Sequence, residues 1–217
     1  MYRVKEVFYS LQGEGAQQGR PAIFCRFSKC NLWNGREKDR ATAVCNFCDT
    51  DFVGTDGQNG GTFISASALA AHLNAFWPRH QGQKYVVCTG GEPLLQLDSP
   101  LIKALHELGF EVAVETNGTL PAPEGIDWLC VSPKSTAPVV IEHCDELKLV
   151  YPQQDALPDQ FSHIRANHYY LSPMADPLIR SGSDSTKQTN TQAALDYCLQ
   201  HPKWKLSLQL HKILGID

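Results

Sequence analysis

The chain has 217 residues, enough for one fairly large domain, and its 42% hydrophobic and 19% charged residues are ordinary for a soluble globular protein. Its net charge of −4, with scattered basic residues, excludes a general electrostatic footprint for nucleic acid. No stretch approaches the roughly twenty apolar residues of a membrane span, and the N-terminus lacks a signal-peptide core. We therefore expect a cytoplasmic protein that binds neither nucleic acid nor membrane.

Short apolar runs alternate with helical patterns along the chain. Their continuous hydrophobicity favours strands that are covered on both faces. The predicted strands are 22–27, 85–89, 111–115, 128–132, 146–150, 169–172 and 206–210. Helices are predicted over 65–77, 99–109 and 191–201. The apolar side of the first consists of Leu69, Leu73 and Phe76, and that of the second of Leu101, Leu105 and Leu108. The apolar side of the third consists of Leu195, Cys198 and Leu199.

The helix over 99–109 carries its own boundary signals. Ser99 is expected to cap the first turn, Pro100 suits the first helical position, and Gly109 suits the exit. Strands that alternate with helices imply parallel crossover units. A full eight-unit barrel takes about 250 residues, and this chain also carries a long cysteine loop over 30–48. We therefore predict an α/β fold, a shortened and partly open parallel (β/α) barrel, as one domain over 1–217.

Polar segments follow four of the predicted strands. They are "TGGEP" from Thr89, "ETNGT" from Glu115, "SPK" from Ser132 and "SPM" from Ser172. In parallel α/β folds ligands lie beyond the carboxyl ends of the strands. These four segments therefore predict the rim of a binding site.

Eight cysteines in a reducing compartment are expected to be thiols, metal ligands or catalytic groups. Two residues separate Cys45 from Cys48, and fourteen residues separate Cys30 from Cys45. A structural zinc site would need a fourth ligand, for which His143–Cys144 is a candidate. The alternative is that the cysteines are buried small hydrophobes, which fits Cys25, Cys88, Cys130 and Cys198 but not the polar surroundings of Cys45 and Cys48.

Three thiolates can also hold an iron–sulfur cluster, because cysteine thiolates are its usual ligands. A cubane of four irons held by three thiolates keeps one iron free for a small molecule. The spacing alone leaves this cluster site and the zinc site open.

The segment Cys45-Asn46-Phe47-Cys48 resembles the cysteine motif of radical S-adenosylmethionine (SAM) enzymes, and Gly90-Gly91-Glu92-Pro93 resembles their glycine–glycine–glutamate segment. The first cysteine gap is much longer here than in most of that superfamily. It is similar to the gap of some 7-carboxy-7-deazaguanine synthases, as are "EVFYSLQGEG", "ETNGT", "SPK" and "LSLQLHK". The resemblance covers nearly the whole chain and implies a barrel of the radical SAM type.

This resemblance implies that Cys30, Cys45 and Cys48 hold a [4Fe–4S] cluster that cleaves SAM to a 5′-deoxyadenosyl radical. The implied reaction is ring contraction of 6-carboxy-5,6,7,8-tetrahydropterin to 7-carboxy-7-deazaguanine with loss of ammonia, on the way to queuosine and other 7-deazapurines. The implied SAM-binding residues are Phe47, Asp49, Gly91, Glu92, Ser132, Pro133, Lys134, Ser172, Pro173, Met174 and Ala175.

The implied substrate carries a guanine-like edge and a carboxylate, so it needs both acceptors and a cation. Arg26 is expected to clamp the carboxylate. The candidate substrate residues are Leu11, Gln12, Gly13, Glu14, Arg26, Thr89, Glu115, Asn117, His211 and the main-chain carboxylate of Asp217, with Ile213, Leu214 and Ile216 docking the tail.

Thr50 matches a family position that binds Mg²⁺, an ion that prefers oxygen ligands. The resemblance also implies a flavodoxin-like electron donor and a homodimer. Two other functions stay open: an activase that installs a glycyl radical on a partner protein, and a zinc-binding interaction module.

Overall fold

The computed structural model of the protein describes residues 1–78, 82–179 and 182–216. Within them one sheet has the strand order β3-β1-β2-β4-β5-β6-β7-β8-β9. β1 pairs antiparallel with β2 and β3, and the pairings from β2 to β9 are parallel. The strands are β1 (Tyr2–Leu11), β2 (Pro21–Phe27), β3 (Gly61–Phe63), β4 (Lys84–Gly90), β5 (Phe110–Thr116), β6 (Trp128–Val131), β7 (His143–Tyr151), β8 (Arg165–Pro173) and β9 (Lys205–Leu206).

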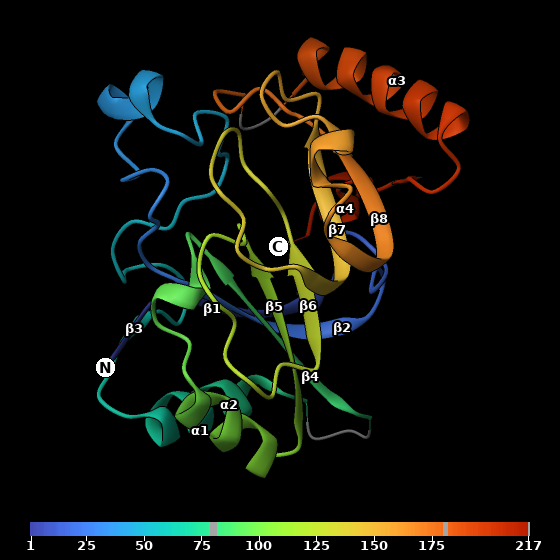
Figure 1. Ribbon diagram of the computed structural model, residues 1–217. Coiled ribbons are helices and arrows are strands. Elements are labelled where there is room, and N and C mark those ends of the chain that lie inside the picture. The colour runs from blue at the N-terminus through green and yellow to red at the C-terminus, as the bar shows by residue number, and fades with distance from the viewer. Residues whose placement is uncertain (79–81, 180–181, 217) are drawn as a thin grey trace.

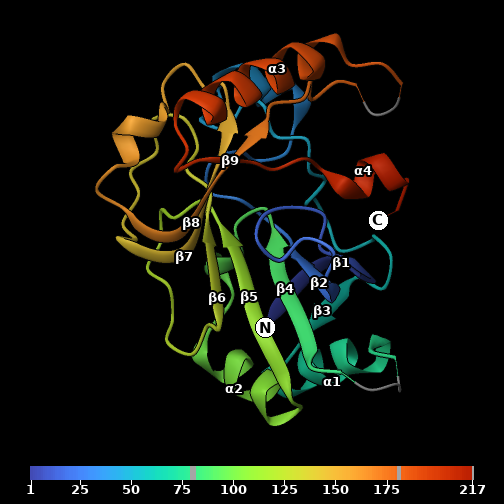
Figure 2. The ribbon, with the colours of Figure 1, turned by 90° about the vertical axis from the view of Figure 1, so that its right-hand side faces the viewer.

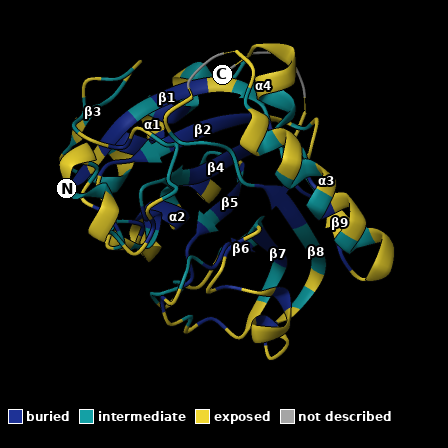
Figure 3. Cartoon of the chain, turned by 90° about the horizontal axis from the view of Figure 1, so that it is seen from above, coloured by how far each residue is buried: buried dark blue, intermediate teal, exposed yellow. Residues whose placement is uncertain are grey.

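Seen from above, these strands follow an open arc from β1 to β8 and do not close into a ring (Figure 3). The predicted open α/β barrel is therefore confirmed, with an antiparallel edge that the sequence did not indicate. The helices are α1 (Ala66–Phe76), α2 (Ser99–Glu107), α3 (Ser185–Gln200) and α4 (Leu210–Leu214), and the 3₁₀ helices are η1 (Glu37–Thr42), η2 (Pro93–Leu95) and η3 (Pro158–Phe161). No helix in the described part of the chain is long and apolar enough to cross a membrane.

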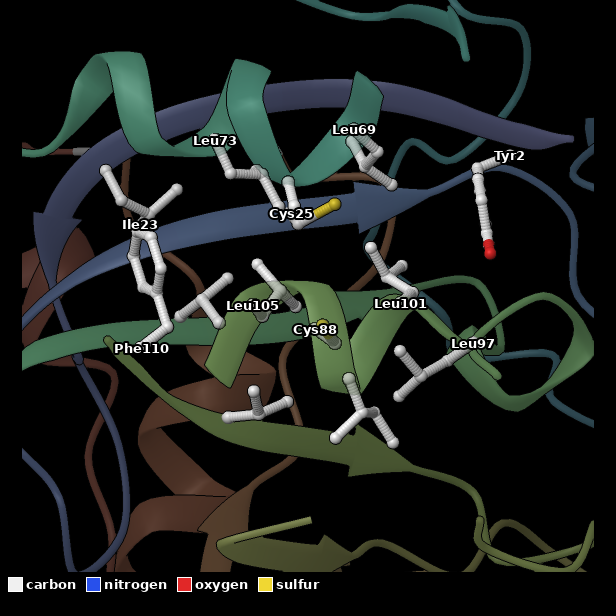
Figure 4. Close-up of a cluster of buried hydrophobic side chains, with 14 of the residues drawn as sticks. Tyr2, Ile23, Cys25, Leu69, Leu73, Cys88, Leu97, Leu101, Leu105 and Phe110 are labelled. Atoms are coloured by element: carbon white, nitrogen blue, oxygen red, sulfur yellow. The ribbon is translucent and has the colours of Figure 1, made fainter. Parts of the chain in front are cut away.

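The main helices cover the outer face of the sheet. α1 and α2 lie together below the sheet, whereas α3 lies beside β8 at its other end (Figures 1 and 2). Leu73 of α1 and Leu105 of α2 pack in one buried cluster with Cys25 of β2 and Cys88 of β4 (Figure 4). A second cluster joins Leu147, Leu149 and Leu171 of the sheet to Ala194 of α3.

Residues alternate between the two faces of each strand, so the inner face carries a different set. On β5, Val112 and Val114 belong to the outer cluster, whereas Ala113 packs against the inner aromatic rings of Phe8 and Phe24. Because the apolar core is mostly outside the arc, the inner face is left for polar side chains.

The predicted strand over 206–210 is wrong beyond its first residue. The Ser207 N–H still donates to the Leu171 carbonyl at 2.9 Å, but the chain then leaves the sheet and α4 begins at Leu210. The Leu210 N–H donates to the Gly13 carbonyl at 2.9 Å. The apolar alternation after Leu206 therefore belongs to a segment that crosses over the 12–20 loop and not to a longer edge strand.

The cap of α2 also differs from the prediction. The carboxylate of Asp98 accepts the Leu101 N–H at 3.0 Å, so Asp98 is the N-cap and Ser99 is the first helical residue. Two good capping residues stand next to each other, and the side chain of Asp98 is the one that accepts the free N–H group. The predicted exit at Gly109 is confirmed by its φ of 81°.

α3 begins at Ser185, six residues before the predicted start, and Asp184 caps it by accepting the Lys187 N–H. Its predicted apolar side is wrong at Leu195 and Leu199, which are exposed, whereas Ala194 is buried. Tyr197 and Cys198 pack with Ala194 on the sheet. In the sequence, the pair Ala194 and Cys198 and the pair Leu195 and Leu199 have the same helical spacing of four residues. The side of α3 that carries Ala194 and Cys198 faces the sheet, together with the large Tyr197 ring.

Candidate active site at the carboxyl ends of the strands

A cavity of about 400 Å³ lies at the carboxyl ends of β4 to β8, inside the arc. All four polar segments predicted as a rim contribute to its wall. The predicted site residues that line it are Leu11, Gln12, Gly13, Glu14, Arg26, Cys30, Cys45, Phe47, Cys48, Asp49, Thr50, Thr89, Gly91, Glu115, Asn117, Ser132, Lys134, Ser172, Pro173, Met174, Ala175 and His211. Glu92 and Pro133 do not line it, and Asp217 lies outside the described residues.

Cys30, Cys45 and Cys48 share one side of this cavity. The hydrogen bond between the thiols of Cys45 and Cys48 raises the pKa of Cys45 and lowers that of Cys48 to about 7. The nearby Lys134 ammonium also lowers the pKa of both thiols, whereas burial raises that of Cys30. One readily formed thiolate and a neighbouring cation suit a site that binds metal through sulfur.

The arrangement does not suit a single zinc ion. In the described ranges, no three or more His, Cys, Asp and Glu side chains are grouped closely enough to hold one metal ion. His143, the candidate fourth ligand, begins β7, whereas Lys148 and Val150 at the other end of that strand line the cavity. His143 and Cys144 border a separate depression with Arg165. Three thiols spread along one wall fit a larger iron–sulfur cluster better than a mononuclear site.

The remaining cysteines have structural positions. Cys25, Cys88 and Cys130 are buried, as predicted, and burial raises the pKa of each thiol. Cys198 is only half-buried on α3, where it packs at the edge of the second cluster.

Glu92 is fully buried behind the wall of the cavity. Its carboxylate accepts hydrogen bonds from the Thr116 hydroxyl at 2.7 Å, the Asn117 N–H at 2.8 Å and the Leu94 N–H at 3.0 Å. These bonds tie the loop after β4 to the end of β5. Burial raises the pKa of Glu92 despite the hydrogen bonds. This glutamate therefore fixes the wall that Gly91 and Asn117 present to the cavity.

On the opposite side, Lys148 of β7 forms ion pairs with Glu14 at 2.8 Å and with Glu115 at 3.4 Å. Gln12 donates to Glu115 at 3.1 Å, and the Thr89 hydroxyl donates to it at 3.3 Å. The sequence predicted the other four residues but not Lys148. The available signal was a lysine inside the otherwise apolar run "LKLV" of a strand covered on both faces.

Arg26, predicted to clamp a carboxylate, already has an acidic neighbour. Its Nε donates to Glu6 at 2.6 Å, and its guanidinium lies 6.0 Å from the centre of the Phe8 ring. Thr50 and Asp51 also line the cavity. The lining therefore combines the Arg26 cation with several oxygen atoms.

The C-terminal segment closes another side of the cavity. Lys212 of α4 forms an ion pair with Asp49 at 2.7 Å. His211 lies against Gly13, where a Cβ on the glycine would collide with the imidazole ring, and burial lowers the pKa of His211. α4 thus bridges the 12–20 loop and the residue directly after the cysteine loop. The sequence indicated His211, whereas Lys212 was missed because a lysine near a chain end is usually solvated.

Comparison with known proteins gives concordant matches. The model of the radical SAM superfamily matches residues 40–150, which include Cys45 and Cys48. The chain is 59% identical to the 7-carboxy-7-deazaguanine synthase of Bordetella pertussis and 57% identical to that of Caulobacter vibrioides, each over 99% of both chains. Its structure resembles that of QueE from Escherichia coli with a TM-score of 0.67 and 25% identity, covering 97% of this chain and 94% of the other.

Proposed function

Because the chain belongs to the radical SAM superfamily and, within it, to the 7-carboxy-7-deazaguanine synthases, we propose that it contracts the ring of 6-carboxy-5,6,7,8-tetrahydropterin. The product is 7-carboxy-7-deazaguanine, with release of ammonia, in queuosine and 7-deazapurine biosynthesis. The observation that carries the proposal is a single cavity that is lined both by three thiols and by two half-buried acids paired with Lys148. An enzyme of this family needs a cluster site and a pterin site next to each other.

An enzyme of this superfamily uses a [4Fe–4S] cluster and SAM. Cys30, Cys45 and Cys48 would hold the cluster, and their shared position on the cavity wall fits three thiolates that leave one iron open. The bound cluster and SAM supply the one-electron chemistry that starts the reaction. Lys134 stabilises the thiolate forms of Cys45 and Cys48, because its ammonium lowers the pKa of both thiols.

The wall next to the cysteines is the proposed SAM site. Phe47, Asp49, Gly91 and Lys134 and the segment 172–175 line the cavity there. Lys134 donates hydrogen bonds to the hydroxyl and the carbonyl of Ser132, which orient the ammonium. Glu92 and Pro133 would act from behind this wall, Glu92 by fixing the backbone that follows Gly91.

The proposed pterin site lies between β1, β5 and β7. Glu14 and Glu115 provide acceptors for the donors of a guanine-like edge, and Gln12 and Thr89 hold Glu115 in place. Arg26 would bind the substrate carboxylate. We also propose that the Thr50 hydroxyl would hold Mg²⁺, whose positive charge would offset the negative charge of that carboxylate. A Thr50→Ala enzyme should keep its cluster and lose its response to a Mg²⁺ titration, and an unchanged response would rule this out.

The deciding experiment is an anaerobic assay with reductant, SAM and candidate pterins, analysed by mass spectrometry. We expect brown protein with about four irons and four sulfides per chain and formation of the deazaguanine only from the carboxylated pterin. A colourless zinc protein would contradict the proposal. Radical formation triggered by a partner protein instead of a pterin would support an activase.

Family likeness further supports three proposals about the setting of the reaction. They are a cytoplasmic location, reduction by a flavodoxin-like donor, and a homodimer of single-domain chains. Light scattering of the holoenzyme tests the dimer, and reduction of the cluster by a purified flavodoxin tests the donor.

A further inference from the structure

The inner face of the sheet contains one lysine that is surrounded by acids. The Lys148 side chain is only 8% exposed. Glu14 contacts it from the loop after β1 and Glu115 from β5, while Glu146 adds a third acid from β7 itself. A buried charge is costly unless it is paired, so this lysine and these acids have to be considered as one unit.

Only two of the three acids face the cavity. Glu14 and Glu115 line it together with Lys148. Glu146 instead accepts the Ala16 N–H at 2.8 Å and the Cys130 thiol at 3.5 Å, and burial raises its pKa. Glu146 therefore supports the 12–20 loop, and the charge of Lys148 is directed at the two acids that can meet a ligand.

Hydrogen bonds leave both acids with oxygens available to a ligand. On Glu115, Oε1 accepts from Gln12 and Lys148, and Oε2 accepts from Thr89. On Glu14, Oε2 takes the Lys148 contact, and the carboxylate also accepts from the Gln209 side chain. A carboxylate has about four acceptor positions, so each can accept at least one more N–H.

We propose that Lys148 is a positioning residue that holds Glu14 and Glu115 as a pair of charged acceptors for the amino and ring N–H groups of a guanine-like edge. The proposal rests on the proposed function and adds to it a residue and a reason for its charge. A lone buried carboxylate would take up a proton, and two neighbouring carboxylates would repel each other. With one ammonium between them, Glu14 can stay ionised, and both side chains are fixed in direction.

The ionisation of Glu14 supports this role. Burial acts to raise its pKa, but the Lys148 charge and hydrogen bond oppose this, and the pKa falls to about 2. The other groups that face Glu14 are His211, the amide of Gln209 and, more remotely, Lys187 of α3. Burial lowers the pKa of His211, so the imidazole is a poor replacement for the ammonium.

Removal of the Lys148 ammonium should therefore make ligand affinity depend on pH, and the direction of this dependence can be worked out. In Lys148→Met the opposing charge and hydrogen bond are lost, so burial raises the pKa of Glu14 above its wild-type value. As the pH falls through that raised pKa, Glu14 gains a proton and stops accepting from the ligand. Ligand affinity of the variant, divided by that of the wild type, should then be lowest at acidic pH and recover as the pH rises.

The test compares dissociation constants on the anaerobic holoenzyme at about pH 6 and about pH 8.5, on either side of neutrality. Two ligands are used, 6-carboxytetrahydropterin and tetrahydropterin without the carboxyl group. Lys148→Met should weaken both ligands by a similar factor, roughly ten- to a hundredfold at the lower pH, and by less at the higher pH. For Lys148→Arg, the ligand affinity of the variant divided by that of the wild type should not change with pH.

Lys84→Met is the matched control, because Lys84 is also a partly buried lysine of the sheet but bonds to Asn74 and to the Leu108 carbonyl, outside the cavity. It should leave both dissociation constants unchanged. If Lys148→Met does not fold, the double variant Glu14→Gln with Lys148→Met removes one charge of each sign and should still weaken both ligands equally.

Each outcome separates the claims. Loss of affinity for the carboxylated ligand alone would show that Lys148 binds the substrate carboxylate, which overturns the positioning role. The positioning role would also be overturned if the ligand affinity of Lys148→Met, divided by that of the wild type, did not vary with pH. A wild-type holoenzyme that binds neither pterin would instead overturn the proposed function itself, and the present inference with it.

Discussion

Gly91 allows an unusually close approach between the loop after β4 and the cysteine loop. Its N–H donates to the Phe27 carbonyl at 3.2 Å, and the next N–H, of Glu92, donates to the Lys29 carbonyl at 2.9 Å. A Cβ on Gly91 would overlap that carbonyl group, 2.5 Å from its carbon, and lie 3.0 Å from the Cβ of Cys30. Gly91→Ala should therefore push the first cluster ligand away from its position.

The size of the effect follows from which atoms are in the way. The obstruction is backbone, which cannot rotate aside as a flexible side chain can, and Gly91 is not in the left-handed region of φ. The penalty is therefore steric, about 3 kcal/mol at the upper end of the range for overpacking. For a chain of this length that corresponds to a fall of roughly 6–12 °C in the melting temperature of the apoprotein.

Gly61→Ala is the matched control. Gly61 lies on edge strand β3, also outside the left-handed region, and the nearest atoms to its added Cβ are ring carbons of Phe63 at 3.6 Å. Melting of both apoproteins measures the steric cost, and iron and sulfide analysis after anaerobic reconstitution measures the cluster. We expect Gly91→Ala to melt lower and to hold substantially less iron. Equal melting temperatures and equal iron content in the two variants would refute the reasoning.

Three further predictions concern the cluster, the C-terminal helix and the α2 cap. Cys30→Ala should abolish cluster-dependent SAM cleavage, whereas Cys88→Ala should mainly lower the melting temperature; full iron content in the first would exclude three-thiolate ligation. Lys212→Met breaks the ion pair with Asp49. It should lower pterin affinity less than tenfold in dilute buffer and have no effect at high salt. A loss of affinity that does not depend on salt would contradict an electrostatic role. Asp98→Ala should cost about 1–2 kcal/mol in urea unfolding, more than Ser99→Ala, and the reverse order would contradict the observed cap.

The sequence predicted those features that depend on local periodicity and on spacing of reactive groups. Strands covered on both faces have continuous apolar runs, so β4 and β5 were located within a residue or two at each end. Polar segments at the ends of parallel strands had to converge, because all those ends lie at one edge. For this reason the residues after Thr89, Glu115 and Ser132 could be placed in one cavity before their contacts were known.

What the sequence could not indicate depends on contacts between distant segments. β1 was missed because its residues Tyr2–Leu11 mix exposed and buried positions and pair antiparallel across the register irregularity near Val4. The end of β9 is decided by the Gly13 carbonyl, which is nearly two hundred positions away in the chain. Lys148 was assigned no role because a lysine in an apolar run gives no indication of which acids will face it.

The alternation of the strands also separates stability from binding in this fold. On β7, Leu147 and Leu149 point into the apolar cluster under α3, while Glu146 and Lys148 point inward. Burying charged groups on the inner face is unfavourable on its own. The fold tolerates this cost because the outer face buries a continuous apolar layer, which stabilises the folded state by roughly 1.5–3 kcal/mol for each large side chain. Truncation of an outer leucine should consequently change stability without changing ligand pH dependence, whereas replacement of Lys148, one residue away, should change that dependence. Neighbouring positions on one strand thus carry two distinct physical roles, and the period of two decides which role each residue has.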